Sequence, residues 1–158
     1  MVILRPMTDG EFADYRAHAV RNYAEEKVRA GNWGPDEACR LAEETLDMLL
    51  PEGVATPEHH LFTIECADGT SIGWLWLAER VEANADRHAF VYEIIIFDDF
   101  RRQGYGRAAM QAAEAKAREL GLATIKLHVF GHNTAARALY ADLGYAETNV
   151  MMEKKLEP

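Results

Sequence analysis

Between an apolar run at 89–97 and a helical pattern at 104–120, the chain reads Arg101-Arg102-Gln103-Gly104-Tyr105-Gly106. The two glycines let the backbone come close to a ligand. The first turn of a helix offers unpaired N–H groups at the positive end of its dipole, which suits a phosphate group. The nearby arginines add charge-assisted hydrogen bonds. This segment therefore predicts a phosphate-binding loop.

Other kinds of loop share part of this pattern. A P-loop is excluded because no Gly-Lys-Ser/Thr follows. Gly104, Gly106 and Ala109 match the loose dinucleotide-binding pattern, but a Rossmann domain also wants an acidic residue about 20 residues further on, at the end of the next strand. Phe130-Gly131 stands there instead. A plain strand–helix turn, with glycines for backbone geometry alone, stays open from this segment by itself.

The flanks of the loop predict a βαβ unit. Residues 89–97 are apolar on both faces except for Glu93, as is typical of a central strand covered on both sides. The alanine-rich pattern at 104–120 predicts a helix that stops at Gly121. A second strand is predicted at 124–130, and the two strands of such a unit are parallel.

The rest of the chain changes between helical and strand periodicity, which predicts an α/β fold in one domain spanning 1–158. Thr8 and Glu11 have the spacing of a capping box at a helix start. The expected elements are a strand at 2–5, a helix from this capping box to about Gly31, a helix from Pro35 to before Pro51, strands at 61–66 and 72–78 joined by a turn at 67–70, a helix at 134–143 and an extended segment at 145–156.

Charge is distributed unevenly along the chain. The 158 residues carry a net charge of -9, which disfavours nucleic acid as a partner. Residues 101–137 hold seven bases and two acids, a net charge of +5, so the remainder carries -14. This pattern predicts a small anionic ligand at the basic segment.

Composition excludes several other classes of protein. Ser71 is the only serine and follows the turn signal Asp68-Gly69, so a Ser-His-Asp hydrolase has no plausible nucleophile. Cys39 and Cys66 cannot form a disulfide framework, and no Cys-x-x-Cys or histidine spacing indicates a metal. No apolar run approaches the roughly 18 residues of a membrane span, and the N-terminus lacks a signal-peptide pattern. We therefore expect a cytoplasmic protein with no membrane partner.

Residues 101–106 resemble the coenzyme A loop of the GCN5-related N-acetyltransferases, the GNAT superfamily, which reads Arg/Gln-x-x-Gly-x-Gly/Ala. That family ends in a strand, an Asn, a short helix with a Tyr, and Gly-aromatic. The segment from His128-Val129-Phe130 through Asn133 and Tyr140 to Gly144-Tyr145 is similar. The resemblance covers nearly the whole chain. It implies a mixed, twisted sheet flanked by helices, with a splayed parallel strand pair forming the cofactor cleft.

A narrower resemblance is to the YycN-like bacterial branch. It rests on Tyr-Ala-Glu-Glu-Lys at 23–27 and His-Val-Phe-x-His-Asn at 128–133.

The family resemblance implies acetyl-coenzyme A as co-substrate and no metal. It implies that loop N–H groups hold the pyrophosphate, that backbone groups of the preceding strand pair with pantetheine, and that a second wall closes the cleft. The residues so assigned are Gln103, Gly104, Tyr105, Gly106 and Arg107 with Arg101 and Arg102 for the loop, Ile94, Ile95 and Ile96 for the strand, and Asn133 and Ala136 for the wall.

Two residues are candidates for the chemistry. Tyr140 matches the family's proton donor to the departing thiolate, and its alternative is a buried core tyrosine. Glu93 is the candidate base, because a carboxylate in an apolar strand has a raised pKa. Alternatively, Glu93 lies at the mouth of the strand, where it faces water or pairs with an arginine. A chain of water molecules would then act as the base. Trp74 and Trp76 share one strand face and belong either to the core or to a pocket wall.

The resemblance implies an N-acetyltransferase that moves an acetyl group to a primary amine by direct attack in a ternary complex. The amine, in a small molecule or a peptide, would enter from the acidic N-terminal side. Two alternatives remain: a non-catalytic coenzyme A-binding or sensor domain, which needs the loop but not Tyr140 or Glu93, and a dinucleotide-dependent oxidoreductase. The protein is expected to be a monomer or a homodimer.

Overall fold

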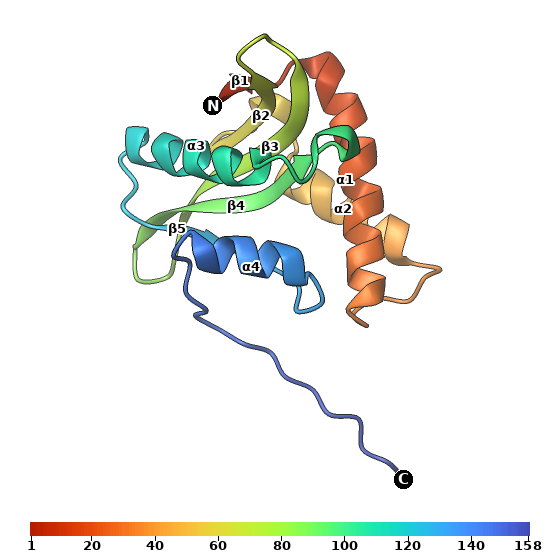
Figure 1. Ribbon diagram of the computed structural model, residues 1–158. Helices are drawn as coiled ribbons and strands as arrows, with labels where there is room; N and C mark the ends of the chain where they lie inside the picture. The colour runs from red at the N-terminus through yellow and green to blue at the C-terminus, as the bar shows by residue number, and fades with distance from the viewer.

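A computed structural model describes all 158 residues (Figure 1). It contains one five-stranded sheet in the order β1-β2-β3-β4-β5. The first four strands are antiparallel neighbours, and β4 and β5 are parallel. The elements are β1 (Val2–Pro6), α1 (Asp9–Arg29), α2 (Ala38–Leu49), the 3-10 turn η1 (Gly53–Ala55), β2 (His59–Cys66), β3 (Ser71–Val81), β4 (Arg87–Ile96), the 3-10 turn η2 (Asp98–Phe100), α3 (Tyr105–Glu119), β5 (Ile125–Leu127) and α4 (Thr134–Asp142).

Helices cover both faces of the sheet, which confirms the expected α/β class (Figure 1). Side chains of α1 and α2 pack with Trp76 and Ile95 on one face. Side chains of α3 pack with Leu75 and Leu77 on the other. Neighbouring residues of β3 therefore enter different cores, as the two-residue period of a strand requires.

The start of α1 is fixed by the predicted capping box. The Glu11 N–H donates to the Thr8 hydroxyl at 3.2 Å, and the Thr8 N–H donates to the Glu11 carboxylate at 2.8 Å. Arg5 on β1 also donates to that carboxylate at 2.6 Å and lowers the pKa of Glu11 to about 2. The first turn of α1 is thus tied to the sheet edge.

A β-bulge interrupts β4 where it leaves β5. Trp76 on β3 pairs with Glu93, but the next residue, Leu77, pairs with Val91, so Tyr92 is an extra residue on β4. Pairing of β4 with β5 covers only residues 89–91. Beyond that point the two parallel strands separate, as the expected splayed pair requires.

Two expected boundaries were wrong. The second helix begins at Ala38 rather than at Pro35, because the N–H groups of Glu37 and Ala38 both donate to the Gly34 carbonyl and make residues 34–37 a turn. The strand expected at 124–130 is limited to Ile125–Leu127, because β4 turns away and leaves residues 128–130 without a partner.

Residues 145–158 form no helix or strand, and Figure 1 shows their extended path leading away from the rest of the chain. None of the helices combines the length and the apolar character needed to cross a membrane.

Candidate functional site

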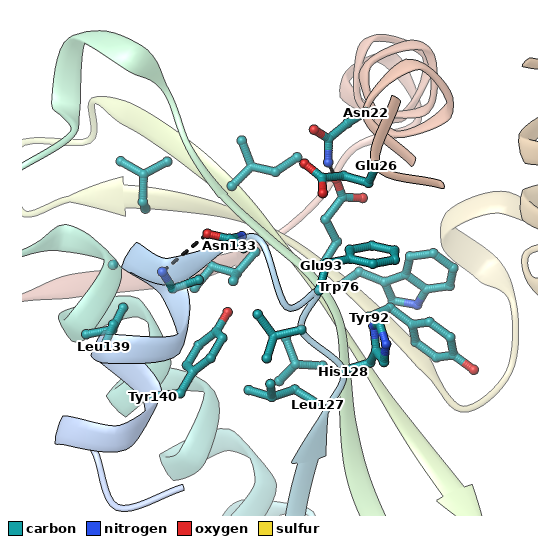
Figure 2. A pocket seen from close by; sticks show the side chains of 18 of the residues that line it. Asn22, Glu26, Trp76, Tyr92, Glu93, Leu127, His128, Asn133, Leu139 and Tyr140 are labelled. Carbon is teal, nitrogen blue, oxygen red and sulfur yellow. Dashed lines mark hydrogen bonds between the residues drawn. The ribbon is translucent and has the colours of Figure 1, made fainter. Parts of the chain in front are cut away.

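A cleft of about 1150 Å³ opens where β4 and β5 part. Its walls come from α1, the second half of β4, residues 100–107, and the segment from β5 to α4. Figure 2 shows Glu93 and Tyr140 entering this space from different elements, β4 and α4. The predicted phosphate loop, the candidate base and the candidate acid therefore share one cavity.

The phosphate loop presents free N–H groups. Gly104 precedes α3 with φ +83°, a left-handed conformation that favours glycine, and no side chain caps the helix. The N–H groups of Gly104, Tyr105, Gly106 and Arg107 have no acceptor within the protein. They point out of the positive end of α3, which is the arrangement that binds phosphate in other helix-start sites.

The arginines of the loop differ in their freedom. Arg101 is held by Asp98 at 3.0 Å and by the Ile96 carbonyl, to which its Nε donates at 2.9 Å. Arg107 pairs with Asp142 of α4 at 3.3 Å. Arg102 is exposed, has no carboxylate partner and adopts φ +60°. Arg102 is therefore the loop cation available to an anionic ligand.

Gln103 and Gly106 have structural contacts within the loop. The Gln103 side chain donates to the Asp99 carbonyl at 3.1 Å and so braces the turn. A Cβ at Gly106 would lie 3.5 Å from Leu139 of α4, whereas one at Gly104 would meet nothing within 4 Å. The missing side chain of Gly106 therefore faces α4.

The edge of β4 offers backbone groups to the cleft. Successive residues of an antiparallel strand direct their N–H and C=O groups to opposite edges. Phe97 donates to the Ile72 carbonyl at 2.9 Å, so Phe97 faces β3, and so does Ile95, two residues before it. Ile94 and Ile96 face the opposite edge, where β5 no longer runs. Of the three isoleucines, these two have backbone groups directed into the cleft.

Glu93 is a partly buried carboxyl with no cationic partner. The Tyr15 hydroxyl donates to it at 3.1 Å, and the Asn22 side-chain amide donates at 3.4 Å. Burial raises the pKa of Glu93 to about 7, although the two hydrogen bonds act in the opposite direction. Neither donor was predicted from the sequence, because each lies on α1, more than 70 residues away from Glu93.

The wall opposite Glu93 carries Tyr140 and Asn133. Burial raises the pKa of the Tyr140 phenol above its ordinary value, so the group stays protonated at neutral pH. Its hydroxyl makes no hydrogen bond within the protein. The Asn133 side chain caps α4 by accepting the Ala136 N–H at 3.3 Å. Asn133 and Tyr140 both line the cleft (Figure 2).

Contacts between distant segments complete the part of the cleft beside α1, and the sequence did not predict them. Glu26 of α1 hydrogen-bonds to His132, just before α4, and so joins the two walls. Trp76 lines the cleft and is also buried in the α1–α2 core. Its indole N–H donates to His59 Nδ1 at 2.9 Å, and its ring stacks on Tyr92 with centroids 4.3 Å apart. Trp74 packs edge-on against Phe97.

No group of three or more His, Cys, Asp or Glu side chains is arranged to hold a metal ion.

Comparison with known proteins gives a consistent family. The profile of the Acetyltransferase (GNAT) family matches residues 20–145. The uncharacterized N-acetyltransferase YycN of Bacillus subtilis is 39% identical over 98% of this chain and 99% of its own length. The uncharacterized N-acetyltransferase YdgE of the same organism is 35% identical over 97% of each chain. These relatives confirm the expected YycN-like resemblance.

Solved structures agree in fold. The crystal structure of YycN superposes with a TM-score of 0.93 at 38% identity and covers 100% of both chains. AAC(6')-Iy, solved in complex with the bisubstrate analog CoA-S-monomethyl-acetylneamine, superposes with a TM-score of 0.62 at 18% identity, covering 100% of this chain and 99% of that one.

The raised pKa of Glu93 predicts a specific pH dependence of stability. Between the reference pKa of 4.5 and the folded value of about 7, the folded protein binds a proton that the unfolded chain does not. The free energy of unfolding therefore falls as pH rises through this range. Glu93→Gln is neutral at every pH. Relative to the wild type, its free energy of unfolding should increase between pH 5 and pH 8, by up to about 3 kcal/mol.

Chemical denaturation at a series of pH values measures this difference. Glu43→Gln is the matched control, because Glu43 is exposed and has no ion pair, and its difference from the wild type should stay constant with pH. Tyr15→Phe removes a hydrogen bond that favours the ionised form and should raise the pKa of Glu93 further. A Glu93→Gln difference that is flat with pH would contradict the raised pKa.

Proposed function

The chain belongs to the GNAT family and is an acetyltransferase, and we propose that it transfers the acetyl group of acetyl-coenzyme A to a primary amine by direct attack in a ternary complex. The observation that carries this proposal is the placement of Glu93 and Tyr140. A carboxyl with a pKa of about 7 and a protonated phenol enter one cleft from β4 and from α4. Direct aminolysis of a thioester needs both kinds of group.

The features of the loop and of β4 fit coenzyme A. The free N–H groups at the start of α3 and the unpaired Arg102 suit its phosphates. The cleft-facing backbone groups of Ile94 and the N–H of Ile96 suit the amides of pantetheine, which would pair with them as an added strand does, while the Ile96 carbonyl accepts from Arg101. The coenzyme A-based analog in the related AAC(6')-Iy fold supports this assignment.

Each protein group has a defined part in the proposed transfer. A bond forms between the amine nitrogen and the acetyl carbon, and the bond from that carbon to sulfur breaks. Glu93 accepts the proton that the nitrogen loses, directly or through water, and Tyr140 donates a proton to the departing thiolate. A cleft-facing N–H of β4 would polarise the thioester carbonyl.

The acceptor would enter between α1 and the β5–α4 segment. Glu26 and Glu93 supply carboxylates there, and the chain outside residues 101–137 carries a charge of -14. These charges favour a cationic amine, in a small molecule or a peptide, over an anionic one. A sensor domain would require only the phosphate loop, so the pairing of Tyr140 with Glu93 favours the enzyme.

We also propose that residues 1–158 act as one N-acetyltransferase domain in the cytoplasm. One sheet links the first strand to the last, and Cys39 and Cys66 are both free thiols, as a reducing compartment favours.

Coenzyme A binding tests the phosphate loop. Arg102→Ala removes the free cation and should weaken coenzyme A binding about tenfold, by calorimetry, because one charge-assisted contact is lost. Arg118→Ala is the matched control. It removes the same charge near the other end of α3, 16 residues along the chain, and should bind like the wild type. Equal binding by both variants would place the phosphate site elsewhere.

Tyr140→Phe separates the enzyme from a sensor. The variant lacks one hydroxyl, so we expect kcat for thiol release from acetyl-coenzyme A to fall about a hundredfold while coenzyme A affinity stays within a few-fold. Tyr145→Phe removes the neighbouring phenol, which donates to Glu114, and should retain kcat. The assay uses a panel of amines with a no-amine hydrolysis control. Unchanged turnover in Tyr140→Phe would exclude it as the acid.

Glu93→Gln tests the base. The variant cannot accept a proton, so kcat/KM at pH 7 should fall about a hundredfold with cofactor affinity retained. The loss should shrink toward pH 10, where a lysine-like amine with a pKa of about 10.4 is increasingly neutral before it binds. In the wild type, kcat/KM should rise up to about pH 7 as Glu93 ionises. The same loss at every pH would instead show that Glu93 acts by charge.

A further inference from the structure

The cleft contains more positive charge than the phosphate loop alone supplies. Apart from the loop arginines, its lining has three cationic side chains and only two acidic ones, Lys27, Arg29 and Arg80 against Glu26 and Glu93. None of these three cations forms an ion pair within the protein. The chain has 26 acidic and 17 basic residues, so carboxylates are in excess. Cations left without one inside a cleft therefore indicate a ligand that brings its own negative charge.

Arg80 is the cation whose surroundings are best defined. Its guanidinium carbon lies 4.5 Å from the centroid of the Phe90 ring and 5.8 Å from that of the Tyr92 ring. The nearby carboxylates of Glu79 and Glu82 pair with other cations, at 2.8 Å and 2.5 Å. The aromatic rings contact the guanidinium carbon, and its N–H donors stay free for an acceptor. A planar carboxylate is an acceptor that matches this fork of donors.

A row of aromatic rings connects Arg80 with Glu93. Trp76 lies opposite Glu93 in the pairing of β3 with β4, and its ring stacks on Tyr92 (Figure 2). The Tyr92 ring meets Phe90 edge-on, with centroids 4.8 Å apart. Phe90 precedes Glu93 by three strand residues, so the guanidinium over Phe90 lies about 10 Å from the Glu93 carboxyl. All five residues line the cleft, which thus has an apolar floor between a carboxyl and a cation.

We infer that the acceptor amine also carries a carboxylate about 10 Å from its nitrogen, and that Arg80 binds this carboxylate. The inference rests on the proposed function, because that function places the nitrogen at Glu93. The body of the molecule would lie over the aromatic rings. Its ammonium end would meet the acidic residues of the cleft, and its anionic end would meet a cation that the protein leaves unpaired.

Calorimetry with coenzyme A bound tests the inference without relying on turnover. The probes are ω-aminooctanoate, with an amine and a carboxylate at opposite ends, and its primary amide, which has the same shape and no negative charge. One charge-assisted contact should make the dissociation constant of the acid about tenfold smaller than that of the amide. Equal constants would overturn the inference.

Thiol release from acetyl-coenzyme A with the same two amines separates this inference from the proposed function. Release with both amines and no preference in binding would support the transferase and overturn the carboxylate site. Tighter binding of the acid without thiol release would support the carboxylate site and contradict the proposed function.

Variants of two arginines locate the contact. Arg80 is exposed, so Arg80→Gln should fold, and it should lose the preference for the acid. Arg80→Glu should reverse it, so that diaminooctane binds more tightly than the acid. Arg87→Gln is the matched control, because Arg87 is exposed on the same hairpin, pairs with Glu79 and lies outside the cleft, and it should keep the tenfold preference. A preference that survives in Arg80→Gln, or that Arg87→Gln also loses, would overturn the inference.

Two tripeptide amides distinguish the sources of such an amine. Ala-Ala-Glu amide carries a carboxylate on its third residue, and Ala-Ala-Gln amide is its neutral counterpart. If ω-aminooctanoate and the glutamate peptide are both preferred over their neutral counterparts, the inference is supported with a peptide terminus as acceptor. If only ω-aminooctanoate is preferred, the inference is supported with a small molecule as acceptor.

Discussion

Hydrogen bonding between β4 and β5 stops after three residue pairs, and the chemistry of the cleft follows from that interruption. The bulge at Tyr92 turns β4 away from its parallel neighbour. The backbone of Ile94 and Ile96 then has an open edge, and the segment after β5 is free to form the opposite wall. A regular five-stranded sheet with the same residues would bury these groups against one another and leave no cleft between β4 and β5.

Helix α1 sets the electrostatic character of that opening. It supplies the two hydrogen bonds to Glu93 from Tyr15 and Asn22, and it reaches the opposite wall through Glu26 and His132. No arginine or lysine accompanies Glu93, so burial dominates and its pKa lies near neutrality. A cationic partner would keep Glu93 ionised but would make it a weaker base. The absence of one suits proton transfer at physiological pH.

Local patterns predicted most of the fold because local contacts produce it. The capping box at Thr8, the glycine at position 104 and the strand period of β2 and β3 depend on neighbours a few residues apart. The position of α1 across the sheet determines the partners of Glu93 and the contact of Glu26 with His132. No local sequence pattern predicts that position. The start of α2 was misplaced because Pro35 suits the turn before a helix as well as a first helical residue.

The left-handed backbone at Arg102 lowers the stability of the fold, whereas the arginine side chain keeps an unpaired cation in the loop. A non-glycine residue at φ +60° costs about 1 kcal/mol or more, and glycine or asparagine would relieve that cost. Either replacement would also remove the one loop cation that has no partner in the protein. Selection for heat resistance alone would therefore favour losing this arginine, and the gain set against that cost is the positive charge that it supplies to the proposed coenzyme A site.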